Sequence, residues 1–276
     1  MLSLVSKQRS KSGFTLIELL VVIAIIAILA AILMPVFVEV RKTALRVSCM
    51  TQMKQIWQAA SKYADDRNGK LPPATYNIGG TTPDNPRDAE LWPAMIEAYF
   101  KKQRPSFWQS DSHMAWRLLR CPADKIDPMD RPENGNRGVY RPGSEYYWFY
   151  NWSVCASPGY NYAYFSPFSA QTGDAMPVYT SSAARPAQTV MFADSCPLWA
   201  ESGESYGYFL ISAPLAGQIP DTVTYGNWRK DATFPAMETG WVYGRHRGAA
   251  NVIWLDGHAS VMRPKDLADN DLWDLR

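Results

Sequence analysis

The sequence predicts an α+β protein in which a long N-terminal α-helix, transmembrane in its first half, packs on a head with an antiparallel β-sheet. Three observations support this fold class. Residues 19–38 carry no charge, and about 20 apolar residues suffice to cross a bilayer core as a helix. Helical apolar spacing then continues to Asp65, and the last part of the chain alternates β-prone runs with turns.

The uncharged run has a composition that favours membrane insertion. Fourteen of its twenty residues are Leu, Ile, Val or Phe, which together favour insertion by roughly 4–8 kcal/mol, whereas one central carboxylate costs about 2.5–3.5 kcal/mol. Glu18 lies at the edge of the run, so insertion is expected. The preceding residues include three basic and no acidic ones, namely Lys7, Arg9 and Lys11. The positive-inside rule therefore places the N-terminus in the cytoplasm and the chain after Val38 outside it.

A secretory signal peptide is the alternative explanation for this run. Such peptides usually have an apolar core of about 7–15 residues, followed by a small-residue cleavage site. Here the run is longer, no Ala-x-Ala-like exit precedes Glu39, and the small residue Gly13 stands before the run. We therefore expect an anchor. A charge inside a membrane usually has a partner, so Glu18 either pairs with another group or reaches the membrane interface.

The helix is expected to continue well beyond the membrane. No Pro or Gly occurs from Arg41 to Asp65, and Pro72 and Pro73 exclude a continuation past that region, so the predicted helix runs from about Thr15 to Asp66. A second helix is predicted over Leu91–Lys102. The apolar face of the extended part is expected to comprise Val47, Met50, Met53, Ile56, Trp57, Ala60 and Ala64.

The remainder of the chain is expected to be β-rich and loop-rich, in keeping with its 20 Pro and 17 Gly residues. An Asp256-Gly257 pair between two apolar runs predicts a β-hairpin. The predicted strands are Glu145–Tyr150, Tyr160–Phe165, Thr189–Asp194, Asn251–Leu255 and His258–Met262.

The charge balance and the motifs exclude several classes of function. The chain has 28 basic and 26 acidic residues. Three of the basic residues lie in the first 13, so the remainder is nearly neutral, and nucleic-acid binding gains no support. Gly-x-Ser-x-Gly, the phosphate-binding Gly-x-x-x-x-Gly-Lys and His-Glu-x-x-His are all missing from the sequence. No catalytic residue is assigned, and the chain is not expected to be an enzyme.

Four cysteines are present: Cys49, Cys121, Cys155 and Cys196. None forms a Cys-x-x-Cys pair, so spacing alone does not predict a zinc site. An even number outside the cytoplasm permits two disulfides in three possible pairings. We favour Cys49 with Cys121 and Cys155 with Cys196, because Cys49 falls on the long helix and Cys121 opens a Cys-Pro-Ala-Asp turn. Four buried free thiols are the alternative.

The segment from Gly13 to Ile26, Gly-Phe-Thr-Leu-Ile-Glu-Leu-Leu-Val-Val-Ile-Ala-Ile-Ile, resembles the class III signal of type IV prepilins and type II secretion pseudopilins. The resemblance implies that prepilin peptidase cuts between Gly13 and Phe14 and methylates the new terminus at Phe14. It also implies that Glu18 neutralises the terminal amine of a neighbouring subunit. Pro35 matches a helix-kinking proline that is common in these stems.

The resemblance implies a pilin-like fold in three parts. These are a cleaved leader (1–13), a stem helix (14–68) with its transmembrane part at about 16–38, and an extracytoplasmic head (69–276). The expected location is the cytoplasmic (inner) membrane as a single-pass protein, with later assembly into a periplasmic or cell-surface filament. The implied partners are prepilin peptidase and other pilin or pseudopilin subunits.

His246, nine further residues and Asp256-Gly257 resemble a C-terminal signature of prepilin-like proteins with an uncharacterised head. In a structural interpretation Asp256 caps the turn, Gly257 supplies a positive φ, and His246 bonds Asp256 or Asp194. A metal or catalytic site of His246, Asp256, His258 and Asp194 is the alternative. Related pseudopilins bind calcium near the C-terminus, so a further alternative is a calcium site of Asp266, Asp269, Asp271 and Asp274. No cofactor or metal is assigned.

The expected function is that of a structural subunit of a type IV pilus-like or type II secretion pseudopilus filament. One alternative is a membrane-anchored binding module, an adhesin or a carbohydrate-capture protein, that uses pilin-type export. The other is a membrane-tethered hydrolase that uses His246 and Asp256.

Overall fold

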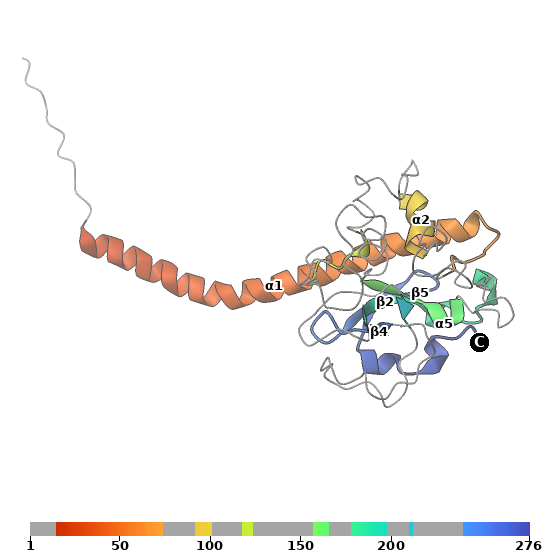
Figure 1. The fold of residues 1–276 in the computed structure, drawn as a ribbon. Coiled ribbons are helices and arrows are strands. Elements are labelled where there is room, and N and C mark those ends of the chain that lie inside the picture. The colour runs from red at the N-terminus through yellow and green to blue at the C-terminus, as the bar shows by residue number, and fades with distance from the viewer. Residues whose placement is uncertain are drawn as a thin grey trace, which may run out of the picture. The chain divides into compact units, whose positions relative to one another are not determined.

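The computed structural model describes residues 15–73, 92–100, 118–123, 157–165, 178–197, 210–211 and 240–276. The chain divides into two compact units, residues 1–44 and 45–276. Helix α1 (Leu16–Asp65) is continuous over 50 residues (Figure 1), which confirms the predicted long helix. Its stop is also as predicted: Asn68 and Gly69 have positive φ, and the Gly69 amide closes the helix by donating to the carbonyl of Ala64.

The N-terminal part of α1 is apolar on all sides. Among the described residues α1 is the one helix long and apolar enough to cross a membrane. Its large apolar side chains from Leu16 to Val40 are exposed, and Pro35 lies inside this stretch without ending the helix. A helix that is apolar all round is typical of a membrane span or of a helix packed among other apolar helices.

The C-terminal part of α1 is amphipathic and belongs to the head. Its buried residues are Cys49, Met53, Ile56, Ala59, Ala60, Tyr63 and Ala64. The predicted face is confirmed in part. Val47 is 56% exposed, Met50 and Trp57 are half-buried, and the buried set begins at Cys49 instead. The helical repeat places residues 49, 53, 56 and 60 on one side, and the sequence interpretation had left Cys49 out of the apolar set.

Within the described residues, the head contains a six-stranded sheet with the order β1-β3-β4-β2-β5-β6. The strands are β1 (Pro158–Asn161), β2 (Val190–Pro197), β3 (Leu210–Ile211), β4 (Gly240–Val242), β5 (Ala250–Trp254) and β6 (Ala259–Met262). Four neighbours, β4-β2-β5-β6, form an antiparallel sheet, which confirms the predicted α+β class. Strand β1 also pairs antiparallel with β2, whereas the short β3 runs parallel to β1 and β4.

Most local predictions hold within the described residues. Helix α2 (Trp92–Phe100) and strand β2 lie where they were expected, and β5 and β6 form the predicted hairpin. The prediction of a strand over Tyr160–Phe165 is wrong for its last four residues, because Tyr162–Phe165 forms the short helix α5. The side-chain amide of Asn161 donates to the carbonyls of Val190 and Trp273, and these bonds fix the strand end. The predicted strand Glu145–Tyr150 lies outside the described residues.

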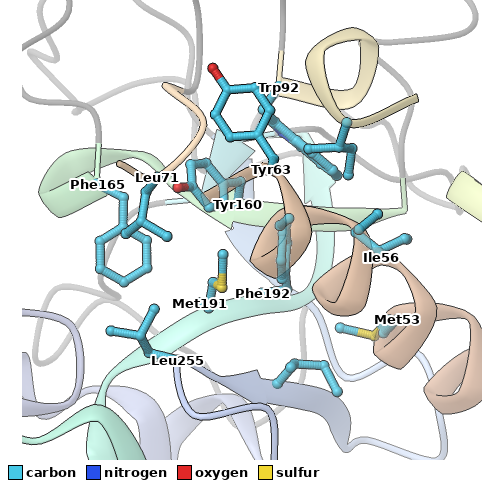
Figure 2. Packing of buried hydrophobic residues seen from close by; sticks show 14 of the residues in the cluster. Met53, Ile56, Tyr63, Leu71, Trp92, Tyr160, Phe165, Met191, Phe192 and Leu255 are labelled. Carbon is cyan, nitrogen blue, oxygen red and sulfur yellow. The ribbon is translucent and has the colours of Figure 1, made fainter. Parts of the chain in front are cut away.

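Two apolar layers hold the head together, one on each face of the sheet. The first lies between α1, α2 and the sheet, and Figure 2 shows its side chains, with Phe192 against Trp92 and Tyr160 at ring-centroid distances of 5.1 and 5.2 Å. The second contains Trp254, Leu267 and Trp273. After β6 the chain forms two 3-10 helices, η6 (Pro264–Leu267) and η7 (Asn270–Leu272), and this part of the chain covers the second layer. Two more 3-10 helices, η3 (Thr180–Ser182) and η4 (Pro186–Gln188), precede β2.

A β-bulge in β2 decides which side chains face α1. The pairing of β2 with β5 shifts register between Val190 and Phe192. Val190 contributes to the layer away from α1, whereas Met191 and Phe192 both contribute to the α1 layer. A bulge adds one residue and so inverts the alternation that follows it. Asp194, two residues after Phe192, therefore also points toward α1.

Candidate functional site

The first candidate site is the N-terminal end of α1. Gly13 and Phe14 lie outside the described residues, whereas Thr15 and Glu18 are described. The Glu18 carboxylate accepts hydrogen bonds from the backbone N–H and the hydroxyl of Thr15, both at 2.8 Å. In return, the backbone N–H of Glu18 donates to Oγ1 of Thr15 at 3.3 Å. This reciprocal arrangement is a capping box, which satisfies two of the free N–H groups at a helix start.

The capping box gives Glu18 a role inside its own chain that the sequence interpretation missed. The pattern Thr-x-x-Glu at residues 15–18 directly before an apolar run is the signature that would have revealed it. A carboxylate has about four lone-pair positions. Its bonds to Thr15 therefore leave capacity for a further positive or donating group.

The second candidate site is a cluster of four buried side chains in the head. It consists of Cys49, Cys121, Asp194 and His246, whose ligand atoms all lie within 4.8 Å of one another. Their residues are at most 5% exposed. Each comes from a different part of the chain: α1, the segment 118–123, β2 and the turn that leads into β5. Within the described ranges this is the only such group of three or more His, Cys, Asp or Glu side chains.

The distances within the cluster are short and involve all four residues. The Sγ of Cys49 lies 3.3 Å from Oδ1 of Asp194 and donates to it. The Nε2 of His246 lies 3.4 Å from Oδ2 of Asp194 and 3.5 Å from Sγ of Cys121. His246 therefore directs Nε2, rather than a carbon of its ring, toward the other three side chains.

Burial perturbs the ionisable groups of the cluster. It raises the pKa of Asp194 to about 7, although the Asn251 N–H and the Cys49 thiol oppose the shift. It lowers the pKa of His246 to about 4, assisted by the positive charges of Arg245 and Arg46. The Cys121 thiol, burial and the Asp194 carboxylate together raise the pKa of Cys49 well above its usual value. The surroundings of the cluster thus disfavour the charged forms of Asp194, His246 and Cys49.

Backbone and serine contacts hold the cluster residues in place. The backbone N–H of Cys121 donates to Oγ of Ser157 at 2.8 Å, and Ser195 donates its hydroxyl to the carbonyl of Ser157 at 2.7 Å. The backbone N–H of Ala123 donates to Sγ of Cys121 at 3.4 Å. The backbone N–H of Asn251 donates to Oδ2 of Asp194 at 2.7 Å. Two of the four ligand groups are thus oriented by fixed N–H donors.

A tight turn positions His246. The residues between His246 and Ala249 are Arg247 and Gly248, which both have positive φ, 63° and 80°. His246 and Ala249 exchange backbone hydrogen bonds at 3.0 and 3.3 Å across this turn. Two central residues with positive φ define a type I′ turn, which suits a two-residue hairpin. The sequence interpretation missed this turn because Arg is not among the residues that favour positive φ.

The other predicted site residues lie elsewhere. Asp256 and His258 contact each other, Oδ1 to Nδ1 at 2.7 Å, in an exposed turn, so the predicted set of both with Asp194 and His246 is not brought together. Cys49 and Cys121 are free thiols here, and their disulfide stays a prediction. Cys155 and the side chain of Cys196 lie outside the description. The described acidic residues of the tail, from Asp266 to Asp274, do not form a metal cluster.

The Asp256-Gly257 turn packs directly on α1. Trp57 donates its ring N–H to the carbonyl of Leu255 at 3.0 Å. Gly257 has a φ of 91°, and a Cβ added there would lie 2.5 Å from the Trp57 ring. Glycine is therefore required at this position for two reasons: the positive φ of the backbone and the close approach of the Trp57 ring. His246 has its ring nitrogen within 4.8 Å of the Cys49 sulfur, and Gly257 packs on Trp57. The two ends of the predicted signature therefore lie beside α1 about two turns apart.

Replacing Gly257 is expected to destabilise the head. In Gly257→Ala the new Cβ is strained by the positive φ and also clashes with the Trp57 ring. We therefore expect a loss of about 2–5 kcal/mol in the free energy of unfolding. Gly248→Ala is the matched control, because its φ is 80° but an added Cβ has nothing within 4 Å; it should cost about 1–2 kcal/mol. Denaturant unfolding of both variants, and of Gly257→Ala combined with Trp57→Ala, measures the difference. Equal losses for the two glycine variants would contradict the packing argument.

The matches between this chain and known proteins lie in its N-terminal region. Residues 8–34 match the family described as the prokaryotic N-terminal methylation motif, so the chain carries a motif of the type IV pilin and pseudopilin class. Over 37 residues the chain is 67% identical to the type IV wide pilus major component PilA4 of Thermus thermophilus. That match covers 13% of this chain and 28% of the relative. No solved structure matches the chain.

Proposed function

We propose that the chain is a structural subunit of a type IV pilus-like or type II secretion pseudopilus filament, assembled through its N-terminal helix after prepilin peptidase has removed residues 1–13. The observation that carries this proposal is the methylation motif at residues 8–34. Before assembly the subunit is anchored in the inner membrane by α1, with the head outside the cytoplasm.

The character of α1 supports this role. The stretch from Leu16 to Val40 exposes large apolar side chains all round, so it needs either lipid or other apolar helices as its surroundings. A filament whose subunits pack stem against stem supplies such surroundings after the subunit leaves the membrane. The second half of α1 is anchored in the head through Met53 and Ile56, and the head is then carried on the outside of the filament.

Glu18 has a defined place in this proposal. Cleavage after Gly13 creates an α-amine on Phe14, and such an amine is positively charged near neutral pH. In an apolar filament core an unpaired amine or carboxylate is costly, and removing one partner of a buried pair leaves the other uncompensated. Pairing Glu18 of one subunit with the Phe14 amine of the next would satisfy both charges and set the axial register of the stems.

Processing can be tested with a co-expressed prepilin peptidase. We expect the intact mass of the membrane-extracted chain to fall by the mass of residues 1–13 and to rise by one methyl group, with a methylated Phe14 at the new terminus. Gly13→Leu should keep the full-length mass, because a large side chain replaces the small residue at the cut. Ser12→Leu, one residue earlier, is the control and should still be cut after Gly13. Retention of Met1 in the wild-type chain would contradict the proposal.

A further inference from the structure

We propose that the head contains a structural metal site in which Cys49, Cys121, Asp194 and His246 bind one zinc ion. The four side chains offer two sulfurs, one carboxylate oxygen and one imidazole nitrogen. This donor set is suited to zinc, whose structural sites are usually four-coordinate and closed to solvent. The near-complete burial of all four residues fits a closed structural site rather than a catalytic one with an open position.

The spacing of the ligand atoms fits a tetrahedral ion. With bonds of about 2.0–2.3 Å, a tetrahedral zinc ion holds its ligand atoms about 3.3–3.8 Å apart. The distances of 3.3 Å from Sγ of Cys49 to Oδ1 of Asp194 and 3.5 Å from Sγ of Cys121 to Nε2 of His246 fall in this range. All remaining separations are within 4.8 Å. Small rotations of the side chains would complete the coordination.

The surroundings of the cluster are those of a supported metal site. The backbone N–H of Asn251 donates to Oδ2 of Asp194, and the other carboxylate oxygen, Oδ1, faces the sulfur of Cys49. The N–H of Ala123 donates to the Cys121 sulfur. Hydrogen bonds of this kind orient metal ligands and tune the metal they hold.

A nearby positive charge also suits the proposed site. Zinc with two thiolates and one carboxylate carries a net charge of −1. The guanidinium of Arg245, the residue before His246, donates to the carbonyl of Ser195, the residue after Asp194, at 2.6 Å. A positive charge therefore lies close to the proposed site and can offset this negative charge.

A disulfide between Cys49 and Cys121 accounts for fewer of these observations. It would remove the thiol that donates to Asp194, so that the buried carboxylate would keep only the Asn251 N–H and His246 as neighbours in the cluster. Buried polar groups are costly unless they are paired or coordinate a metal. A zinc ion would be coordinated by all four side chains, and it would link four segments that are far apart in the sequence.

Zinc binding at this site is a proton exchange without electron transfer. The two thiols release their protons to solvent, and each sulfur donates an electron pair to the ion. The carboxylate and the neutral imidazole donate one pair each, and no group is oxidised or reduced. The disulfide, in contrast, requires an oxidant that removes two electrons and two protons from the thiols.

The first test uses the wild-type full chain, extracted in detergent and purified without added metal. We expect inductively coupled plasma mass spectrometry to find about one zinc ion per chain. Removal of zinc with a chelator should lower the Tm of the head by about 10 °C, and Zn²⁺, but not Mg²⁺ or Ca²⁺, should restore it. Co²⁺ in place of zinc should give the visible absorption of a tetrahedral ion and a thiolate-to-cobalt charge-transfer band.

Variants then assign the ligands. Asp194→Asn and His246→Gln, which keep size and hydrogen-bonding capacity, should each reduce the bound zinc by at least about tenfold. His258→Gln is the matched control, because His258 lies in the same C-terminal region but pairs with Asp256 at the surface; it should keep the full zinc content. The cobalt charge-transfer band should weaken in Cys49→Ser and in Cys121→Ser.

The wild-type measurements alone can overturn the proposal, even if the variants fail to fold. A zinc-free chain in which peptide mapping finds Cys49 bonded to Cys121 would refute it. A chain with free thiols that gains neither bound Zn²⁺ nor thermal stability when the ion is added would refute it equally. Neither result would bear on processing at Gly13, so the filament proposal and the metal site are tested separately.

Discussion

Glu18→Gln is expected to abolish filament assembly while leaving the subunit folded and membrane-inserted. Glutamine can still accept the N–H of Thr15 and so keeps the capping box, but it cannot neutralise the Phe14 amine of a neighbour. Breaking a buried pair by removing one partner costs about 3–5 kcal/mol, which corresponds to more than about a hundredfold loss in the association of two subunits. The measurement is the amount of chain recovered in the sheared filament fraction relative to the membrane fraction.

Thr15→Ala is the matched control for this prediction. It removes the hydroxyl that accepts the Glu18 N–H but keeps the Glu18 charge, so it should cost only about 1 kcal/mol of local helix stability and should still assemble. If Thr15→Ala lost assembly and Glu18→Gln retained it, the role of Glu18 would be helix capping, and pairing between subunits would be refuted.

Phe192→Ala is expected to have the largest effect on the stability of the head. Phe192 is fully buried between α1 and the sheet, where its ring contacts Trp92 and Tyr160 (Figure 2). Truncating a buried Phe usually costs about 3–5 kcal/mol, since the transfer free energy is lost and a cavity remains. For a unit of this size such a loss corresponds to a decrease in Tm of about 10 °C. Thermal unfolding of the detergent-solubilised chain, followed by near-ultraviolet circular dichroism, measures it.

Val261→Ala serves as the control for the core variant. Val261 is on β6 and 40% exposed, so its truncation should cost less than about 1 kcal/mol. A similar decrease in Tm for the two variants would show that the layer between α1 and the sheet does not dominate the stability of the head.

The elements that the sequence predicted correctly are those defined by local patterns. The extent of α1 follows from the uncharged run at 19–38, from the absence of Pro and Gly between Arg41 and Asp65, and from Pro72 and Pro73 beyond it. The β5–β6 hairpin follows from Asp256-Gly257. The α5 helix was missed because Tyr162–Phe165 has the composition of a strand. Its conformation depends on Asn161, whose partners Val190 and Trp273 are distant in the sequence.

The cluster in the head could not be predicted because no local pattern specifies it. Its members are separated by 72, 73 and 52 residues, far from the short spacings of recognisable zinc motifs. Asp194 faces α1 only because of the bulge near Val190. His246 is presented by a turn with Arg247 at positive φ. The sequence did single out Asp194 and His246, but it grouped them with Asp256 and His258 instead of with the two cysteines.

The central claim is that the chain enters a filament through a processed N-terminus. The most direct test is mass spectrometry of the N-terminal peptide from chain recovered in the filament fraction sheared from cells. We expect a peptide that begins at N-methylated Phe14. Chain found in the membrane fraction alone, with Met1 still at its terminus, would contradict it.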